Sequence, residues 1–175
     1  MKEKYIVRQP IKDAENHIVG YELVYYGENQ AYGSNEENDV NEFAVADTVY
    51  NFLMQNVEKS LKDKVHFMTF TTTLLMKKTP RLFEKERLVI QIDDSVVIHP
   101  LALHFVQQYA KEGYQIAVND FQFAPRYLSL MDFIDYIKIN FQSISGGTLK
   151  NVVDLAHSMN KKCIITNIDS EELYQ

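Results

Sequence analysis

The sequence predicts an α/β fold whose parallel sheet is buried on both faces. Three observations lead to this prediction. Short, nearly all-apolar segments recur along the chain, amphipathic or polar segments separate them, and polar residues follow each apolar segment. Near-continuous apolar strands that alternate with helices are typical of parallel sheets covered by helices. For a chain of this length, we expect a single domain that spans residues 1–175.

The first predicted elements are a β-hairpin and a helix. Residues 5–8 and 17–26 read as two strands, and the polar residues 13–16 between them read as a turn. Asp39 is a candidate N-cap for the helix that follows a polar stretch. Spacings of three and four positions put the apolar residues of this helix on one face; they are Phe43, Ala46, Val49, Tyr50 and Leu53.

Five further strands and four further helices are predicted after this helix. The strands are the short apolar segments 65–70, 88–92, 115–119, 136–139 and 163–166. The helices are expected at 72–76, 100–112, 126–130 and 148–159. Together with the hairpin, these segments give seven strands for one sheet.

Polar side chains recur where the five later strands end. In parallel α/β folds the carboxyl ends of the strands surround the ligand site, so these residues suggest one shared pocket mouth. Strand ends also meet solvent, which explains polar residues there without any ligand. The residues include Thr69, Gln91, Asn119, Asp120, Lys138, Asn140 and Thr166.

Charge and cysteine content narrow the class of protein. The chain has 18 basic and 24 acidic residues and a formal charge of −6, which argues against a general nucleic-acid binder. Cys163 is the single cysteine and has no disulfide partner within the chain, which favours a reducing, intracellular setting. The N-terminus has no signal-peptide pattern and no apolar run is long enough to span a membrane. We therefore expect a cytoplasmic protein.

Two N-terminal segments, residues 8–11 and 18–23, resemble the start of an EAL domain, the bacterial cyclic-di-GMP phosphodiesterase family. The variant they resemble is usually joined to a C-terminal HDOD module. The resemblance continues in order through residues 67–70, 89–92, 117–121, 135–140 and 164–170. It implies a (β/α)8 TIM-type barrel whose first strand is antiparallel to the others.

The resemblance also implies that the barrel is incomplete at its C-terminus. The last strand of the family, with its Gln-Gly-Tyr segment, has no counterpart in residues 1–175. An open barrel exposes unpaired strand edges and apolar surface. We expect a homodimer or another protein partner to cover these edges, or else poor solubility.

Active EAL enzymes hydrolyse a phosphodiester with Mg²⁺ or Mn²⁺ held by carboxylates and an amide, and the resemblance carries these positions onto this chain. Three of them are kept, as Glu22, Asp120 and Lys138. The others are replaced: Tyr26 stands for an arginine, Thr69 for an asparagine, Gln91 and Thr166 for glutamates, and Asn119 and Asn140 for aspartates.

These replacements predict a degenerate site without metal or catalysis. Two divalent cations bring about four positive charges and need several anionic ligands, whereas Glu22 and Asp120 are the only carboxylates kept among the expected ligands. The leading hypothesis is an inactive EAL-like signalling module that acts by protein contact, by self-association or through an attached HDOD module. No metal or other cofactor is expected.

Two alternatives remain open. Because Gln for Glu and Asn for Asp keep shape and polarity, a polar cleft could still bind cyclic-di-GMP through Lys138 without cleaving it. A residual phosphodiesterase with unusual ligands is the second alternative. For Lys138 itself, a buried ion pair with Glu22 or Asp120 is the competing interpretation.

Overall fold

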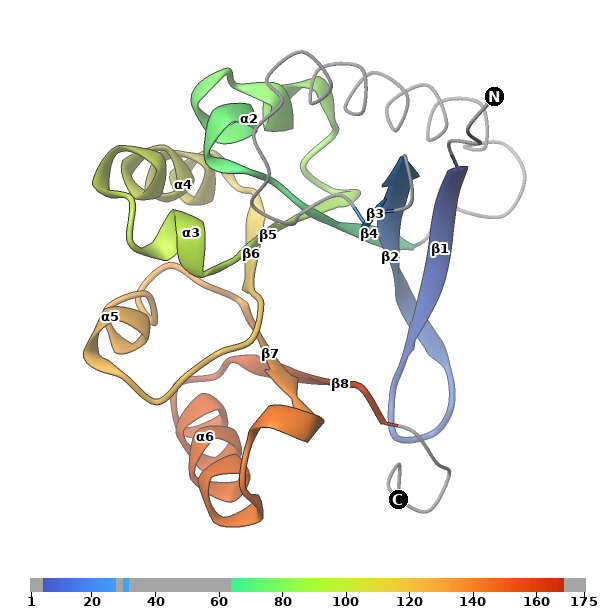
Figure 1. The fold of residues 1–175 in the computed structure, drawn as a ribbon, viewed down its shortest axis with the longest axis vertical. Coiled ribbons are helices and arrows are strands. Elements are labelled where there is room, and N and C mark those ends of the chain that lie inside the picture. Colours follow the sequence, from blue (N-terminus) through green and yellow to red (C-terminus); the bar gives the residue numbers. More distant parts are fainter. Residues whose placement is uncertain (1–4, 28–29, 32–63, 169–175) are drawn as a thin grey trace.

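The computed structural model describes residues 5–27, 30–31 and 64–168. These residues form a strongly curved sheet with helices along its outer side, so that the strands wrap around a central space (Figure 1). The helix predicted over residues 43–53, with Asp39 as its cap, lies outside the described residues. Within the described ranges, no helix has both the length and the apolar character needed to cross a membrane.

The sheet has the order β1-β2-β4-β5-β6-β7-β8, and the short β3 pairs with β2. β1 runs antiparallel to β2, and each later pair along this order is parallel. The predicted barrel-type fold with an antiparallel first strand is therefore confirmed. The strands are β1 (Tyr5–Lys12), β2 (Ile18–Gly27), β3 (Gln30–Ala31), β4 (Val65–Thr69), β5 (Leu88–Ile92), β6 (Gln115–Val118), β7 (Tyr136–Asn140) and β8 (Lys162–Thr166).

The helices have clear start and stop signals. Pro100 opens α4 at a position where its missing N–H costs nothing, and Gly113 ends it with a φ of 106°, in the left-handed region that glycine adopts without strain. Ser145 caps the N-terminus of α6 through its hydroxyl. The helices are α2 (Thr72–Met76), α3 (Asp94–Val97), α4 (Pro100–Glu112), α5 (Pro125–Leu128) and α6 (Gly146–Ser158), with 3₁₀ turns η1 (Thr79–Leu82) and η2 (Phe141–Ser143).

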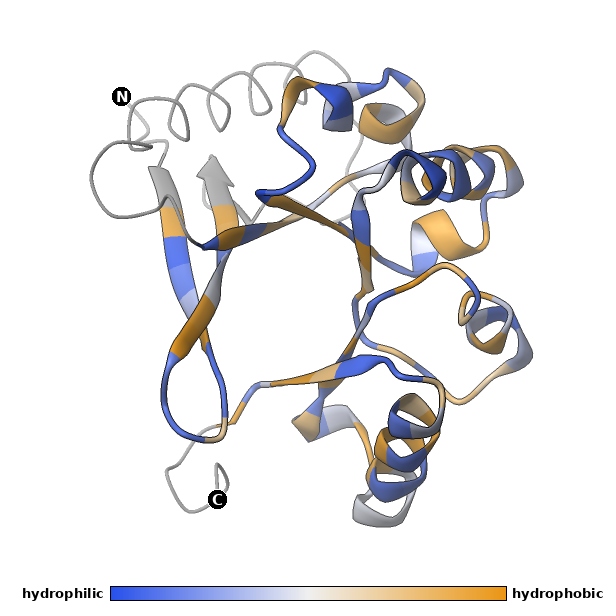
Figure 2. Cartoon of the chain, turned by 180° about the vertical axis from the view of Figure 1, so that it is seen from behind, coloured by the Kyte–Doolittle hydropathy of each residue, from blue (hydrophilic) through white to orange (hydrophobic). Residues whose placement is uncertain are grey.

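Two apolar clusters lie on opposite faces of the sheet. The larger one fills the space between the strands and the outer helices and includes Leu75, Ile90, Val106 and Ile137. The smaller one, centred on Phe67, lies on the inner face. The strands therefore carry apolar residues on both faces. Figure 2 shows the hydrophobic stretches along the strands in orange. This two-sided burial explains the near-continuous apolar strands in the sequence.

Within the described residues, β1 and β8 are the two ends of the sheet order. A hollow lies between Gln9–Asp13 on the hairpin side and Cys163–Ile168 on the β8 side. In this described part of the chain, the sheet therefore does not close between β1 and β8.

Candidate functional site

The inner face of the sheet carries an apolar layer and a polar layer. Phe67, Val89 and Ala117 are buried, with Tyr136 and Ile164 packed against them. Side chains on a strand alternate between faces, so the residues two positions further along each strand also face inward. These residues are Thr69, Gln91, Asn119, Lys138 and Thr166, at or just beyond the carboxyl ends of the parallel strands.

Lys138 lies at the centre of the polar layer. Its Nζ donates hydrogen bonds to Oε2 of Glu22 at 2.9 Å and to Oε1 of Gln91 at 2.7 Å. Lys138 is 4% exposed and Gln91 is fully buried, whereas 24% of the Glu22 side chain is exposed. This ion pair joins β2 to β7 across the barrel. Gln91 on β5 binds the same ammonium and so connects a third strand to the pair.

Amide and hydroxyl groups extend this network. The Nε2 of Gln91 donates to Oε1 of Glu22 at 3.3 Å and to Oγ1 of Thr69 at 3.1 Å. The Nδ2 of Asn119 also donates to Oγ1 of Thr69, at 3.1 Å. The Oδ1 of Asn119 is buried and has no hydrogen-bond partner in the described structure. We refer to Glu22, Thr69, Gln91, Asn119 and Lys138 as the barrel network.

The remaining three predicted site residues lie outside the barrel network. The Oγ1 of Thr166 donates to the carbonyl oxygen of Ile139 at 3.3 Å. Asn140 accepts a hydrogen bond from the backbone N–H of Gln142 and thereby caps η2. Asp120 is exposed and has a φ of 48°, a left-handed conformation that aspartate tolerates at a strand end. The structure thus brings together five of the eight predicted residues.

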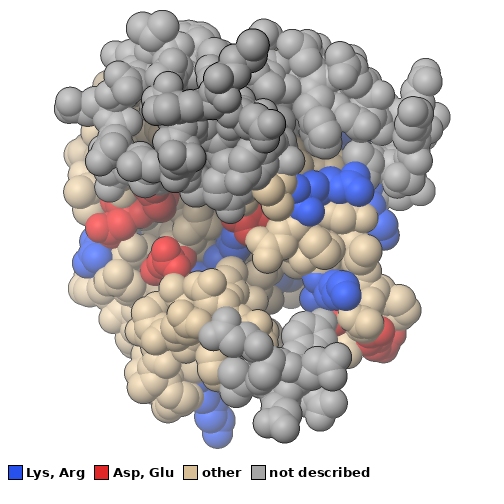
Figure 3. Space-filling view, turned by 45° about the vertical axis from the view of Figure 1, so that its right-hand side comes forward, with Lys and Arg blue, Asp and Glu red and all other residues tan. Residues whose placement is uncertain are grey.

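A hollow of about 1310 Å³ lies next to the barrel network. Five predicted site residues line it: Glu22, Asn119, Asp120, Lys138 and Thr166. Seen from the side of the hairpin, the surface is hollowed near its middle, and charged side chains of both signs lie around it (Figure 3). Among the predicted site residues, a ligand in this hollow would meet the ammonium of Lys138, the carboxylates of Glu22 and Asp120, the amide of Asn119 and the hydroxyl of Thr166. Further charged side chains also line the hollow: Lys12, Asp13, Lys161 and Lys162.

Cys163 also lines this hollow and is half-buried. Burial raises the pKa of its thiol, which keeps the thiol protonated at neutral pH.

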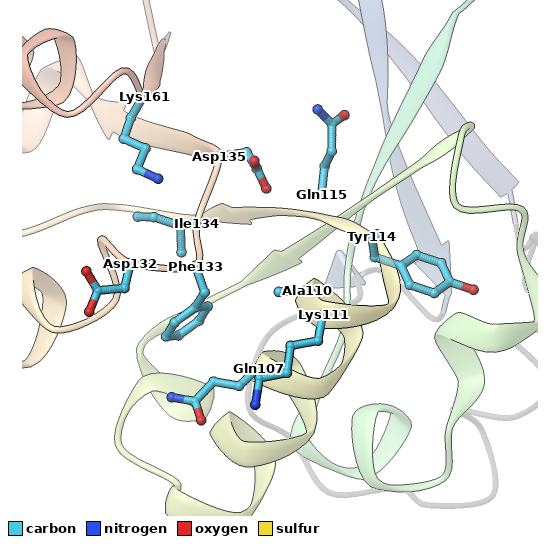
Figure 4. A pocket seen from close by; sticks show the side chains of 11 residues that line it. Gln107, Ala110, Lys111, Tyr114, Gln115, Asp132, Phe133, Ile134, Asp135 and Lys161 are labelled. Atoms are coloured by element: carbon cyan, nitrogen blue, oxygen red, sulfur yellow. The ribbon is translucent and has the colours of Figure 1, made fainter.

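A separate cavity of about 560 Å³ contains none of the predicted site residues. It lies between the end of α4 and the segments that lead into β7 and β8, among Lys111, Asp132, Asp135 and Lys161 (Figure 4). Asp135 is used structurally there, because its Oδ2 accepts the backbone N–H of Ile116. The cavity is at the amino ends of the strands, away from the barrel network.

The carboxyl ends of β5 and β6 hold a second polar contact that the sequence did not reveal. Asp94 begins α3, and its Oδ1 accepts hydrogen bonds from the Tyr127 hydroxyl at 2.8 Å and from Nε of Arg126 at 3.0 Å. These two hydrogen bonds hold the pKa of the Asp94 carboxyl below its usual value. Burial and the same contact raise the pKa of Tyr127 to about 12. Asp94 thus serves to connect α3 to α5.

His66 is a further buried polar residue that sequence reasoning missed. It is 3% exposed, stacks on Tyr21 and leaves its Nε2 without a hydrogen-bond partner in the described structure. Burial, together with the positive charges of Arg8 and Arg87, lowers its pKa to about 4. Histidine is intermediate between the buried and the exposed residue types, so its place in an apolar strand did not single it out.

The donor set of the described site differs from that of a carboxylate-rich metal centre. Nowhere in residues 5–27, 30–31 and 64–168 do three His, Cys, Asp or Glu side chains cluster as metal ligands would. In the barrel network, the carboxylate of Glu22 already faces the ammonium of Lys138. The network offers hydrogen bonds more readily than anionic charge.

Comparisons with known proteins agree with this architecture. No family model matches the chain. Among curated proteins, it is 32% identical over 143 residues to the uncharacterized protein YuxH of Bacillus subtilis, which is 78% of this chain and 34% of that protein. It is 26% identical over 145 residues to the cyclic di-GMP phosphodiesterase CdgJ of Vibrio cholerae, which is 82% of this chain and 33% of that protein. The chain therefore spans about a third of the length of these relatives.

Solved structures give the same result for the fold. The Bacillus subtilis YkuI protein, which has an EAL domain and was solved with cyclic-di-GMP and calcium, superposes with a TM-score of 0.75 at 18% identity. The match covers 97% of this chain and 50% of YkuI. With its antiparallel first strand and parallel later strands, the described chain has the fold of an EAL domain.

Proposed function

We propose that this chain is a signalling module with an EAL fold that does not hydrolyse cyclic-di-GMP and that acts through protein contacts. The observation that carries this proposal is the ion pair between Lys138 and Glu22. Glu22 is the only carboxylate in the barrel network, and a lysine ammonium at 2.9 Å already neutralises it.

The chemistry of the donor set supports the loss of hydrolysis. Two divalent cations need several anionic oxygens, and the barrel network otherwise supplies only amides and a hydroxyl, from Gln91, Asn119 and Thr69. These residues do not fit a two-metal centre. The hydrogen bonds they make with one another stabilise the barrel instead.

A hydrolysis assay tests the proposal directly. The purified chain is incubated with cyclic-di-GMP and Mg²⁺ or Mn²⁺, and the nucleotides are separated by chromatography. We expect no linear product above a blank without protein, while an active phosphodiesterase in the same buffer serves as the positive control. Turnover that Glu22→Ala abolishes would overturn the proposal.

A second experiment tests whether the lack of carboxylates in the barrel network prevents metal binding. Gln91→Glu with Asn119→Asp adds two carboxylates to the barrel network, and we expect this variant to bind Mn²⁺ in electron paramagnetic resonance titrations where the parent chain does not. The control pair Gln107→Glu with Asn151→Asp adds the same charge at exposed helix positions. Tight Mn²⁺ binding by the parent chain would show that the donor-set argument fails.

A second candidate function is a cyclic-di-GMP sensor that binds without cleavage. It is favoured by the unpartnered Oδ1 of Asn119 and by Lys138, which both line the hollow. YkuI, which shares the fold, was solved with cyclic-di-GMP bound. Titration calorimetry separates the two candidates: saturable binding without metal supports the sensor.

Asp120 provides the control for that titration. It is exposed, lines the hollow and repels an anionic ligand, so Asp120→Asn should tighten the binding of a dianionic nucleotide in a sensor. Lack of any heat of binding with both the parent chain and Asp120→Asn would exclude the sensor and leave protein contact as the function.

A further inference from the structure

A hollow separates the two strands that end the described sheet. β1 and β8 are the last strands of the sheet order in the part of the chain that the structure describes, and residues 9–14 and 161–168 line the hollow from the two sides. Its volume of about 1310 Å³ exceeds the roughly 300–1,000 Å³ that is usual for small-molecule pockets. We call this space the β1–β8 gap.

The edge of β8 directs backbone hydrogen-bonding groups into the gap. The backbone N–H of Lys162 donates to the carbonyl oxygen of Asp135 at 3.0 Å, on the side of β7. Successive residues of a strand direct their backbone groups to opposite sides, so those of Cys163 and Ile165 point away from β7. Among the described residues, no strand pairs with this side of β8. An edge of this kind is a template for one more strand.

The apolar layer inside the barrel is incomplete at the gap. Phe67, Val89 and Ala117 are buried in this layer. Ile11 of β1 and Ile164 of β8 pack against them but are only half-buried, and both line the gap. An inward-facing apolar side chain between β1 and β8 would cover both isoleucines and remove their apolar surface from water.

Basic side chains gather at the end of the gap where β8 begins. Lys161 and Lys162 line it there, and Lys12 lies at the same end because β1 is antiparallel to the other strands. Lys162 faces the inside of the barrel, where its Nζ lies 5.6 Å from the ring centre of Tyr136. Asp13, which also lines this end, already accepts two backbone N–H groups of the hairpin turn. This end of the gap therefore favours an acidic side chain.

We infer that the β1–β8 gap binds an extended segment of a partner protein as an added strand, parallel to β8. Side chains along a strand alternate between faces, so every second residue of the segment faces inward. The inward residues are an acidic residue at the level of Lys162, an apolar residue beside Ile164 and a small polar residue beside Thr166. Main-chain hydrogen bonds give such an added strand its affinity, and the inward side chains give it specificity.

This inference rests on the proposed function, since it names the surface and the kind of partner of a module that acts through protein contacts. The two are tested by different measurements. Hydrolysis of cyclic-di-GMP by the chain would contradict the proposed function and leave the binding of the segment unaffected. A chain that neither hydrolyses the nucleotide nor binds the segment would contradict this inference alone.

A synthetic peptide with this pattern is the first test. The probe is Thr-Glu-Thr-Val-Thr-Thr-Thr with blocked ends, and it is titrated into the isotope-labelled 175-residue chain while NMR follows the backbone amides. We expect saturable shifts at Cys163 and Ile165 with a Kd of about 1 mM or lower, and no shifts in β5, which has a neighbour on both sides. Absence of saturable shifts at millimolar probe overturns the inference.

The reversed sequence, Thr-Thr-Thr-Val-Thr-Glu-Thr, is the matched control peptide. It has the same composition, but as a strand parallel to β8 it carries its acidic residue away from Lys162. We expect it to bind about fivefold or more weakly than the probe. Equal affinities of the two peptides would contradict the assigned strand direction.

Charge reversal on both sides tests the acidic contact. Lys162→Glu should weaken the binding of the probe about fivefold or more, and a probe with Lys in place of its Glu should regain affinity for this variant. Lys150→Glu makes the same change of charge at an exposed position of α6 that does not line the gap, so it should leave the affinity unchanged. Circular dichroism checks that both variants are folded. Equal effects of the two substitutions would contradict an acidic partner.

A second copy of the chain is the competing occupant of the gap. Copies that fill each other's gap would compete with the probe, so its apparent Kd would rise with the concentration of the chain. We expect the same Kd at low and high chain concentration. A Kd that rises with chain concentration would contradict a separate partner protein.

Discussion

Lys138 is the residue on which the barrel network depends most. Its ammonium binds both Glu22 and Gln91, and it is 4% exposed. Lys138→Met keeps most of the side-chain volume but leaves a carboxylate and an amide oxygen without this donor. We expect the free energy of unfolding to fall by about 2–3 kcal/mol, somewhat less than for a fully buried pair because Glu22 is partly exposed. Urea denaturation measures this loss.

The double variant Glu22→Gln with Lys138→Met serves as its control. It removes the charge that Lys138→Met leaves unpaired, so it should be more stable than Lys138→Met alone. A loss below about 0.5 kcal/mol for Lys138→Met would place the ion pair among weak surface pairs and contradict the role assigned to it.

His66 gives the chain a predictable response to acid. The pKa of this buried imidazole is lowered from 6.5 to about 4, so the unfolded chain takes up a proton at a higher pH than the folded chain does. The contribution of His66 to the free energy of unfolding is therefore fully present above pH 6.5, and it is lost as the pH falls towards 4. A shift of this size corresponds to at most about 3 kcal/mol.

His66→Phe removes the titrating group and keeps a ring against Tyr21. Denaturation between pH 4 and 6.5 should then show a flatter loss of stability than in the parent chain. His104→Phe, at an exposed position on α4, is the control, because it removes an imidazole without changing the contacts of His66. If His66→Phe and the parent chain lose stability in parallel over this range, His66 is not the source of the response.

Sequence alone could identify which polar residues gather at the site but not how they pair. Parallel strands bring their carboxyl ends to one edge, so the gathering of Thr69, Gln91 and Asn119 follows from strand direction. The partner of Lys138 does not follow in the same way, because β2 and β7 are not neighbours in the sheet. Only the curvature of the barrel decides that Glu22, rather than Asp120, meets the ammonium.

At the scale of elements, predictability depends on length and on local signals. α2 and α4 match the predicted ranges residue for residue, and α4 has Pro100 and Gly113 as clear boundaries. α3 and β3, with four and two residues, were not predicted, since such short segments have no periodicity to read. α5 begins at Pro125 and α6 at Gly146, each one or two residues before its predicted start.

Gly20 is required where β2 meets β4. A Cβ added at this position would lie 3.0 Å from the carbonyl oxygen of Val65 and 3.1 Å from a ring carbon of Phe67. Backbone cannot yield as a flexible side chain does, so Gly20→Ala should lower the free energy of unfolding by about 1–3 kcal/mol. Thermal denaturation followed by circular dichroism measures this change.

Gly147→Ala is the matched control for that prediction. Nothing lies within 4 Å of a Cβ added there, and the residue is in the first turn of α6. Alanine should raise stability slightly at this position, by up to about 1 kcal/mol, because it favours the helix. Equal effects of the two substitutions would mean that the contact with Val65 does not limit Gly20.

At the scale of the whole molecule, the sequence predicts the class of fold but not its exposed surface. Alternating apolar strands and helices are enough to infer the parallel sheet. Ile98 and Phe123, in contrast, look like core residues in the sequence, just as Phe121 does, and only tertiary packing leaves the first two outside. The same holds for the open side of the barrel, whose position depends on which strands end the sheet.

The open side should appear as uneven hydrogen exchange across the sheet. β5 and β6 each have a neighbour on both sides and are almost entirely buried, whereas β8 pairs with β7 and forms an end of the described sheet. In dilute protein, we expect the amides of β5 and β6 to exchange slowest. The amides of β8 that point away from β7, towards the open side, should exchange much faster.

Raising the protein concentration then tests whether the edge of β8 pairs with another copy, as edge strands tend to do. If it does, protection should increase in β8 and stay unchanged in β5 and β6, which already have a neighbour on both sides. Mass spectrometry of peptic fragments follows both regions in one experiment. Protection in β8 that does not change with concentration would mean that this edge does not pair with another copy.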